Sequence, residues 1–553
     1  MVFKYFAPLL LRQRRALCRL SHALYGCVVT RALDAPCEST NNLGNGLFTN
    51  GLRLCWNVRV HPNDAVMIEN LLGPVIGPES IESDCIDEKT WRDKSMSEST
   101  LVSAYEVLEQ AIMSYNGHPV GTVAAHGPHA PAADNYEECF VRDFAVSALV
   151  FLADGKPDIV RHFLETVLTL KDQDRHMEGH EIQPGVMPAS FRTVTDEDGK
   201  QSLLADFGDR AIGRVAPVDS MMWWMILVRA YTHVTGDRKL IEGDDFQHAI
   251  QLILSLCLTG SFEVFPTLLV PDAACMIDRR MGIHGHPLEL QALFYGMLHT
   301  VHELYRPSAD TETLAGRASK RREMLRDYIR AHYWLDAGRL SEIHRFATEE
   351  FGAGGANMLN IYPESIPQWV EHWMPEQGGY LAGNVGAERL DVRFFALGNL
   401  LSILFGLTTE DQAQQIMDLY EARWDDLIGA MPAKLCYPAM EDEEWRLMTG
   451  SDPKNRPWSY HNGGNWPVLL WPLVAAALIT RRRELADRAV AIAADKLMQH
   501  TWPEYYDGPT GRLIGRRANL NQVWSAAGFI FSHRLLENPE LLSMFPGQPT
   551  RTT

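Results

Sequence analysis

Positive charge is scarce in this chain of 553 residues, and its scarcity excludes several classes of partner. The chain has 51 Lys and Arg residues against 70 Asp and Glu residues, a formal net charge of −19 at pH 7. Nucleic acids and anionic membranes bind clustered positive charge, so we expect neither as a partner. A neutral ligand, such as a sugar, is compatible with an acidic protein.

Cysteine pairs and long apolar runs are also missing. The nine cysteines form no Cys-x-x-Cys pair, which favours reduced thiols over a disulfide framework or a zinc site. No stretch reaches the roughly 18 uninterrupted apolar residues of a transmembrane helix, so none is predicted. These features favour a cytoplasmic protein. The sequence is compatible with a homo-oligomer but does not give the number of subunits.

Three common catalytic motifs are absent as well. The chain has no Gly-x-x-x-x-Gly-Lys-Ser/Thr phosphate loop, no Gly-x-Gly-x-x-Gly dinucleotide motif after a strand, and no His-Glu-x-x-His zinc helix. Its 20 histidines are scattered, and pairs such as His284 and His286 lack a closing set of ligands. We therefore predict no metal site.

The first 95 residues differ in composition from the rest of the chain. Six basic residues precede the first acid, Asp34. A basic, acid-poor segment over about residues 1–40 resembles an organellar presequence, which would place the protein in a plastid or mitochondrion. An untargeted N-terminal extension is the alternative. Residues 40–95 are rich in Asn, Gly, Pro and Ser and are predicted to form a poorly ordered linker.

Residues 96–540 alternate long amphipathic segments with short loops, the pattern of an all-α domain, and residues 541–553 follow as a C-terminal tail. Predicted strands are limited to short runs such as 262–270. Twelve predicted helices fit an (α/α)6 barrel of six inner and six outer helices. A solenoid or stacked bundle is the alternative, although the chain lacks the repeats of a solenoid. The predicted helices are 97–115, 137–153, 157–172, 217–235, 240–258, 287–305, 312–334, 389–406, 409–427, 464–480, 483–498 and 520–537.

Acidic residues in aromatic or apolar surroundings are the strongest candidates for chemistry. Asp219 follows Ala-Pro-Val where a helix is predicted to begin, and two tryptophans come soon after it. An aspartate at that place also has an ordinary role as a helix N-cap. Glu444 is followed by Trp-Arg, which could shape a pocket, whereas residues 441–443 are typical of a solvated acidic run.

Other acids stand beside arginines or flat aromatic rings. Arg142 precedes Asp143, and such neighbours are often structural ion pairs; Glu504 lies in the segment Trp-Pro-Glu-Tyr-Tyr-Asp-Gly. Cleavage of a glycosidic bond needs one carboxylic acid to protonate the leaving oxygen and a second carboxylate to attack the sugar or activate water. Loops that combine carboxylates with Trp and His therefore suit sugar hydrolysis, without naming the substrate.

Taken in order, the motifs of residues 117–536 closely resemble those of the alkaline/neutral invertases of plants and cyanobacteria, glycoside hydrolase family 100. They cover roughly three-quarters of the chain. The matching segments are His118-Pro-Val-Gly-Thr-Val-Ala-Ala, Cys139-Phe-Val-Arg-Asp-Phe, Gly185-Val-Met-Pro-Ala-Ser-Phe, Ile212-Gly-Arg-Val-Ala-Pro-Val-Asp-Ser, Cys275-Met-Ile-Asp-Arg-Arg-Met-Gly, Gly383-Asn-Val-Gly, Glu444-Trp-Arg, Ser451-Asp-Pro-Lys-Asn, Trp458-Ser-Tyr-His-Asn-Gly-Gly and Trp502-Pro-Glu-Tyr-Tyr-Asp-Gly.

The resemblance implies an (α/α)6 barrel that binds sucrose in its central funnel and hydrolyses it to glucose and fructose, with inversion and without a cofactor. It implies Asp219 as the general acid and Glu444 as the general base that activates water. Inverting enzymes hold these two carboxyl groups about 6.5–9.5 Å apart. The matched candidates for substrate contacts are Arg142, Asp143, Asp278, Arg279, His461, Glu504, Gln522 and Trp524.

Two alternative functions stay open at this point. The same fold could carry a hydrolase or phosphorylase of another small α-glucoside, or a catalytically inactive sugar-binding protein. Loss of either carboxyl position would favour the inactive protein, yet Asp219 and Glu444 are both present.

Overall fold

The computed structural model describes residues 88–126, 135–170, 176–177, 180–209, 217–258, 265–270, 274–306, 312–345, 361–386, 390–514 and 518–549. All of them belong to one structural unit, Cys85–Thr553. The predicted presequence and most of the predicted linker lie outside the described residues. The first helix begins at Glu88, ahead of the domain start at residue 96 that the sequence suggested.

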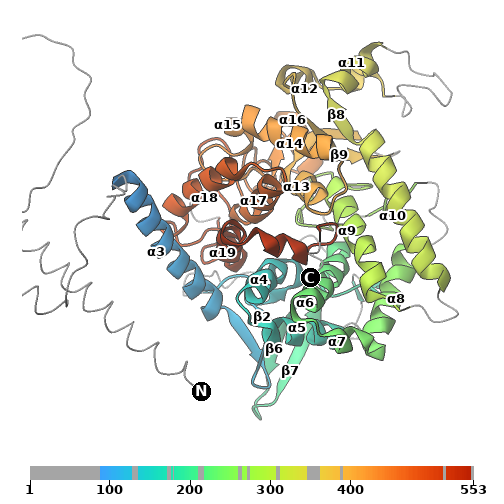
Figure 1. Ribbon diagram of the computed structural model, residues 1–553, viewed down its shortest axis with the longest axis vertical. Coiled ribbons are helices and arrows are strands. Elements are labelled where there is room, and N and C mark those ends of the chain that lie inside the picture. The colour runs from blue at the N-terminus through green and yellow to red at the C-terminus, as the bar shows by residue number, and fades with distance from the viewer. Residues whose placement is uncertain are drawn as a thin grey trace, which may run out of the picture. The chain divides into compact units, whose positions relative to one another are not determined.

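Six helices form a closed inner ring (Figure 1). Each packs against the next, and the last packs back against the first. These helices are short and almost wholly buried, as in α13, where every residue is buried, because a helix that is apolar all round needs neighbours on every side. The ring consists of α4 (Val141–Ala153), α6 (Val218–Thr235), α9 (Leu288–Leu304), α13 (Ala396–Leu404), α17 (Leu470–Ile479) and α19 (Val523–Glu537).

Six further helices surround this ring, and inner and outer helices alternate along the chain (Figure 1). The outer helices bury one face only; α5, for example, buries Ile159, Phe163 and Val167 but exposes Arg161. The arrangement confirms the predicted (α/α)6 barrel. The outer helices are α3 (Glu88–Gln110), α5 (Pro157–Leu170), α8 (Asp244–Cys257), α10 (Glu312–His332), α14 (Glu410–Ala422) and α18 (Arg483–Leu497).

Strands are more extensive than the sequence predicted, and all of them pair antiparallel. One sheet has the order β3-β6-β7 and another the order β11-β10-β9-β8. Two hairpins, β1-β2 and β4-β5, stand apart from them. The strands are β1 (Ile112–Tyr115), β2 (His118–Thr122), β3 (Cys139–Phe140), β4 (His176–Met177), β5 (His180–Glu181), β6 (Ser190–Thr195), β7 (Gln201–Asp206), β8 (Trp334–Asp336), β9 (Gly379–Val385), β10 (Leu390–Phe395) and β11 (Cys436–Tyr437).

Four predicted helices included residues that form strands: 97–115, 137–153, 312–334 and 389–406 overlap β1, β3, β8 and β10. Asn116 and Gly117 both have positive φ, 49° and 81°, which is the turn that joins a tight hairpin and ends the predicted helix 97–115 early. The first residues of the predicted helix 389–406 instead form β10, because they pair with β9 in the register Asp391 to Asn384. Of the predicted strand 262–270, the described residues 265–270 hold only an isolated bridge at Val270.

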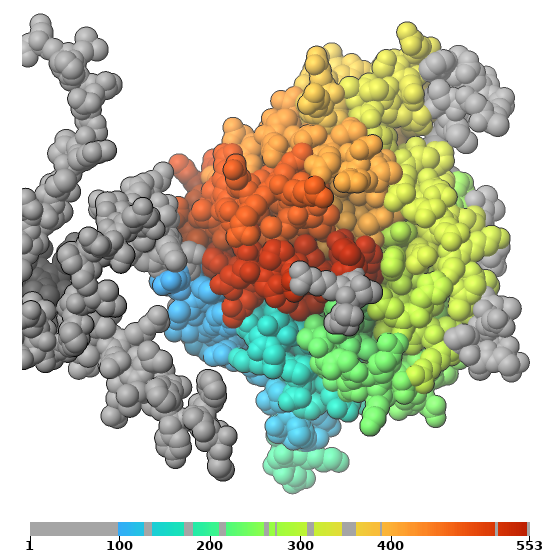
Figure 2. Space-filling view, viewed as in Figure 1, coloured from blue at the N-terminus to red at the C-terminus, as the bar shows by residue number. Residues whose placement is uncertain are grey.

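Short helical turns complete the described elements, and one of them closes the barrel. The turn η5 packs on α6 and α19, and Phe545 after it is fully buried and stacks on Trp471. Figure 2 shows this C-terminal segment in red across the centre of one face, so the residues predicted as a tail are packed as far as 549. The short elements are α7 (Arg238–Glu242), α11 (Ala337–Arg345), α12 (Gln368–Trp373), α15 (Trp424–Leu427), α16 (Asp442–Thr449), η2 (Pro363–Ser365), η3 (Pro467–Leu469) and η5 (Pro539–Met544).

The two ends of the barrel therefore differ. The C-terminal segment lies where inner helices end, since Ser543 accepts a hydrogen bond from Arg229 of α6 and Leu404 at the end of α13 accepts one from Gln548. The opposite end of the barrel, at which the inner helices begin, is therefore the end that is available for a functional site. Within the described residues, no helix has both the length and the apolar character that crossing a bilayer requires.

Candidate active site

Polar side chains gather at the N-terminal ends of the inner helices. Asp143, Asp219 and Glu289 stand in the first turns of α4, α6 and α9, and Gln522 is the N-cap residue of α19. The N-terminus of a helix carries partial positive charge, which favours carboxylates there. The closed ring brings these four helix ends together, although they are far apart in the sequence.

A pocket opens at this end of the barrel, between the helix ends and the loops that precede them. Seven of the ten predicted site residues line it: Arg142, Asp143, Asp278, His461, Glu504, Gln522 and Trp524. Its other lining residues are Ala124, Tyr136, Phe140, Met276, Tyr460 and Trp466. The pocket therefore combines carboxylates, hydrogen-bond donors and flat aromatic faces, which are the groups that bind the hydroxyls and CH faces of a sugar.

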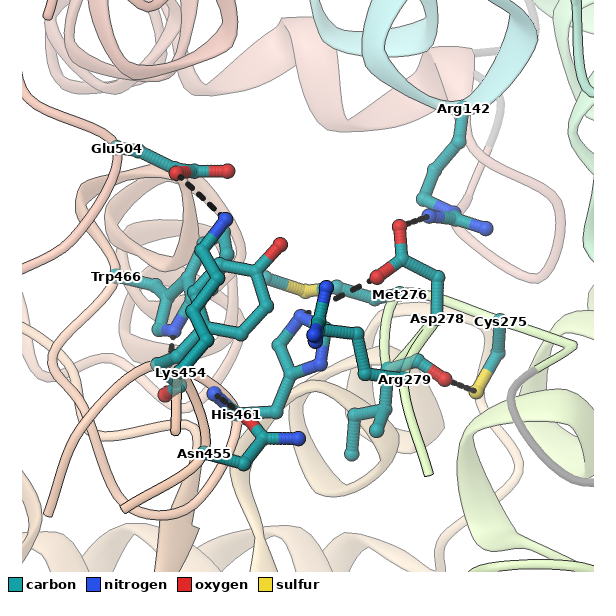
Figure 3. A network of polar contacts seen from close by, with 12 residues as sticks. Arg142, Cys275, Met276, Asp278, Arg279, Lys454, Asn455, His461, Trp466 and Glu504 are labelled. Carbon is teal, nitrogen blue, oxygen red and sulfur yellow. Dashed lines mark hydrogen bonds and ion pairs between the residues drawn. The ribbon is translucent and has the colours of Figure 1, made fainter. Parts of the chain in front are cut away.

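Arg142 connects three of the predicted residues. Its Nε forms an ion pair with Oδ2 of Asp219. Its Nη1 lies 3.7 Å from Oδ2 of Asp278, as Figure 3 shows. The structure gives Arg142 partners from other elements, so the alternative of an ion pair with its neighbour Asp143 is wrong. Strand β3 positions Arg142, because Phe140 pairs with Ser190 of β6 and α4 begins at the next residue.

Asp219 is fully buried, with 0% of its side chain exposed. The N-cap position of α6 is occupied by Pro217, and no side chain caps this helix end. The capping role that we considered for Asp219 is therefore wrong. One of its carboxylate oxygens is paired with Arg142, and the other, Oδ1, is buried without a hydrogen-bond partner. A buried oxygen of this kind is costly unless a ligand or proton satisfies it.

The two tryptophans after Asp219 have different surroundings. Trp223 lines a separate, apolar cavity deeper in the barrel, and Arg142, Met276 and Trp524 line both this cavity and the pocket. Trp224 donates a hydrogen bond to the carbonyl of Leu164 in α5 and is fully buried. It therefore packs between the two rings of helices.

Two pocket carboxyl groups are held closer to their neutral form than usual. Burial raises the pKa of Asp143 to about 8, against the opposing charge of Arg142. Burial also raises the pKa of Asp278 to about 6, while the charges of Arg142 and Lys454 oppose the shift. At neutral pH, Asp143 thus keeps its proton and can donate a hydrogen bond, whereas Asp278 is mainly ionised and accepts.

His461 is fixed by a loop of unusual backbone shape. Tyr460 before it has a φ of 51°, and the amide of His461 donates to Oδ1 of the buried Asn455 at 3.2 Å. Its ring stacks on that of Tyr460 at 4.0 Å, and its Nε2 lies 3.8 Å from Oδ1 of Asp278. Burial lowers the pKa of His461 well below its usual value, and the nearby cations act in the same direction. The imidazole in the pocket is therefore neutral.

Glu504 is held at both carboxylate oxygens. Tyr136 donates its hydroxyl to Oε1 at 2.9 Å, and the side chain of Asn519 donates to Oε2 at 3.1 Å. Lys454 places its Nζ 3.6 Å from the same Oε2 (Figure 3). Glu504 is only 4% exposed, so its position in the pocket wall is determined by these partners.

Arg279 does not line the pocket, although it follows Asp278. Its Nε and Nη2 bind both oxygens of Asp452, at 2.6 and 3.0 Å. This bidentate pair ties the loop before α9 to the loop after α16. Arg279 therefore forms a structural ion pair, and its partner is Asp452 rather than the neighbouring Asp278.

Glu444 stands in a very different environment from Asp219. It lies in the first turn of α16, and its side chain is exposed. Its charge still acts on the buried side chains of Arg393 and Cys436. The thiol of Cys436 in turn contacts the carbonyl of His461 at 3.4 Å. Glu444 therefore belongs to the same end of the molecule without being part of the buried pocket wall.

Three residues of this region escaped the sequence analysis as site residues. Tyr136 and Lys454 act on Glu504, and Glu289 accepts a hydrogen bond from the amide of the pocket residue Met276 at 2.8 Å. Burial raises the pKa of Glu289 to about 7. Lys454 belongs to the motif Ser451-Asp-Pro-Lys-Asn, which could have pointed to it. Tyr136 and Glu289 belong to none of the motifs named in the sequence analysis. Within the described residues, no cluster of three His, Cys, Asp or Glu side chains could hold a metal ion.

Comparison with known proteins shows the family of the chain. The model of the family "Alkaline and neutral invertase" matches residues 104–539. Alkaline/neutral invertase C, mitochondrial, of Arabidopsis thaliana is 47% identical over 80% of this chain and 67% of its own length. Cytosolic invertase 1 of Oryza sativa subsp. japonica is 48% identical over 80% of this chain and 79% of its own. Alkaline/neutral invertase E, chloroplastic, of Arabidopsis thaliana is 48% identical over 79% and 72%.

Solved structures agree on the fold at much lower identity. A structure titled "Glycosidase Wild Type" covers 83% of this chain and all of its own, with a TM-score of 0.50 and 13% identity. At that identity the likeness concerns the fold alone. The match to the family model spans most of the chain and all of the pocket. The chain therefore belongs to the alkaline and neutral invertase family.

Proposed function

We propose that this chain hydrolyses sucrose to glucose and fructose by an inverting mechanism with two carboxyl groups. The observation that carries the proposal is the convergence of seven predicted site residues on one pocket, from segments as far apart as Arg142 and Trp524. Relatives that are 46–48% identical are named invertases, which supports sucrose as the substrate.

In this mechanism Asp219 is the general acid. Its buried position beside the pocket suits a group that must hold a proton, and its free oxygen Oδ1 is the atom that would carry it. After the proton has been donated, the carboxylate that remains is stabilised by Arg142, which is in contact with its other oxygen. Asp278 is the second partner of Arg142, which lies 3.7 Å from it.

Glu444 is the general base. Its exposed carboxylate is in contact with water, which suits a group that removes a proton from the attacking water. Water attack on the face opposite the leaving fructose inverts the configuration of the glucosyl carbon. The position of Glu444 on the short helix α16, rather than in the barrel wall, leaves room for water beside it.

The remaining predicted residues bind the sugar. Neutral His461 and protonated Asp143 can each donate or accept a hydrogen bond, whereas Asp278 and Glu504 accept from hydroxyls. Trp524 offers an aromatic face, and its indole nitrogen is buried without a partner. Gln522 likewise has a buried, unpartnered Oε1. Unused polar atoms in a pocket wall are what a polyhydroxylated ligand would satisfy.

The test is an assay of the purified protein with sucrose, in which glucose and fructose are measured separately, with and without phosphate. We expect equal amounts of both sugars, independent of phosphate, and β-glucose as the first anomer seen by NMR. A phosphate requirement would favour a phosphorylase, and α-glucose as the first product would contradict inversion. Turnover of another α-glucoside in place of sucrose would mean that this glucoside is the substrate. Absence of all turnover would favour a sugar-binding protein.

The cellular location is a separate proposal. The names of the relatives include cytosolic, mitochondrial and chloroplastic proteins. Similarity to them therefore does not distinguish between these three locations. We propose the cytoplasm, with a plastid or mitochondrion as the alternative if residues 1–40 act as a presequence. N-terminal sequencing of the protein isolated from its source distinguishes the two, because a cleaved presequence would shift the first residue.

A further inference from the structure

Lys454 is the cation that completes the charge balance of the pocket. The pocket wall holds Asp278 and Glu504 as acceptors, and like charges so close together repel each other. Among the described residues at this end of the barrel, Arg142 is bound to Asp219 and Arg279 to Asp452. Lys454 is left to face Glu504, with its Nζ 3.6 Å from Oε2.

The structure holds Lys454 in place through both its backbone and its side chain. Its amide donates to Oδ1 of Asp452 at 2.9 Å, and its carbonyl accepts a hydrogen bond from Ser459 at 3.0 Å. Its ammonium lies 3.8 Å from the centre of the Tyr460 ring, a cation–π contact that orients it toward the pocket. Only 20% of the side chain is exposed, so solvent screens its charge weakly.

The charge of Lys454 acts on three pocket side chains. It offsets the negative charge of Glu504 directly, and it opposes the effect of burial on Asp278. It also disfavours protonation of His461, together with Arg279 and Arg142. The loss of this one positive charge would therefore weaken two acceptors and favour a charged imidazole in the same pocket.

We propose that Lys454 is a positioning residue of the active site, whose ammonium balances the charge of Glu504 and Asp278 so that both can accept hydrogen bonds from sugar hydroxyls. This inference rests on the proposed function, because it assigns the two carboxylates to substrate binding. The charged and titratable groups that face Asp278 are Arg142, Asp143, Arg279, Lys454, His461, Glu504, Tyr136 and Tyr460. Those that face Glu504 are Lys454, Asp278, Asp143, Tyr136 and Tyr460, and the side chain of Asn519 donates to it.

The experiment compares the pH dependence of kcat/KM for sucrose in the wild type, Lys454→Met and Lys454→Arg between pH 5 and 9. We expect the acidic limb of Lys454→Met to move up by about one pH unit, with a KM about tenfold higher at pH 6. Lys454→Arg keeps the positive charge, so its acidic limb should stay at the pH of the wild type. Lys156→Met removes a lysine paired with Glu109 at the surface and should change nothing. An acidic limb of Lys454→Met at the wild-type position would overturn the proposal.

A second measurement needs no substrate. The Asp278 carboxyl can be titrated by 13C NMR, with Asp278→Asn for assignment, and its midpoint should move to higher pH in Lys454→Met but not in Lys454→Arg. An unmoved midpoint would contradict the role of Lys454 even if sucrose is cleaved. Failure of the wild type to cleave sucrose would instead contradict the proposed function. If Lys454→Met does not fold, Lys454→Gln carries the same expectations.

Discussion

The carboxylates of two neighbouring regions have opposite surroundings. Those at the starts of the inner helices, such as Asp143 and Asp219, are buried or partly buried beside Arg142, whereas those on α16, such as Glu443 and Glu444, are exposed to solvent. The same functional group thus holds a proton or an ion-pair partner in one region and is hydrated in the other. Enzymes that need an acid and a base at one pH use such a contrast. The following predictions test whether this division is functional.

Removal of the buried acid should have the largest effect. Asp219→Asn keeps the shape of the side chain but cannot donate a proton as a carboxylic acid does, so kcat for sucrose should fall by about 10²–10⁴-fold. Initial rates measure this effect, and circular dichroism checks the fold. Asp154→Asn is the matched control, since Asp154 also pairs with an arginine, Arg534, but outside the pocket. A kcat within threefold of the wild type would remove Asp219 from its role.

Removal of the exposed base should cost a similar factor in kcat without a cost in stability. Glu444→Gln should lower kcat by about 10²–10⁴-fold, and added azide should restore part of the turnover by replacing the activated water. Glu443→Gln, one residue earlier and 69% exposed beside Arg446, should remain near the wild type. Equal losses in the two variants would mean that α16 acts through its overall charge.

The buried carboxyl groups should also make stability fall as the pH rises. Asp143 has a pKa of about 8 in the folded protein, against an ordinary value of 3.8. The folded state therefore binds more protons than the unfolded state between about pH 4 and 8, and stability declines over that range. Asp143→Asn should reduce the fall in melting temperature between pH 6 and 9. Glu289 and Asp278 act in the same direction, so part of the decline should remain.

A change in the outer ring should have the smallest effect and none on catalysis. Thr409 and Gln412 form a capping box at the start of α14, with hydrogen bonds of 3.0 and 3.1 Å. Thr409→Ala should lower the free energy of unfolding by about 1 kcal/mol, measured by chemical denaturation, with kcat and KM unchanged. A loss of activity would show that the outer ring is coupled to the pocket.

Local patterns in the sequence were sufficient to predict the helices of the barrel. The inner helices are apolar all round and the outer ones amphipathic, so their periodicity predicted all twelve to within a few residues at most ends. The errors lie where pairing partners decide the conformation. β10 was predicted as helix because periodicity does not detect its pairing with β9, and the Asn116-Gly117 turn was overlooked.

Site residues were predictable where they stood in motifs, but their contacts were not. The motifs placed Arg142 beside Asp143 and Asp278 beside Arg279, and neighbours in sequence suggested neighbours in space. The structure instead pairs Arg142 with Asp219 and Arg279 with Asp452. Arg142 and Asp143 follow each other at the start of α4, where successive side chains point in different directions. Asp278 and Arg279 lie in the loop before α9, and Arg279 finds its partner on another loop.

By itself, the sequence determined the helices, their alternation and the types of residue available for chemistry, because these depend on local periodicity and composition. Only the tertiary structure decided which carboxylates are buried and which are hydrated, and that Lys454 faces Glu504. Burial and charge pairing are properties of groups brought together by ring closure, from segments that can lie hundreds of residues apart. They set the proton affinities on which the chemistry depends.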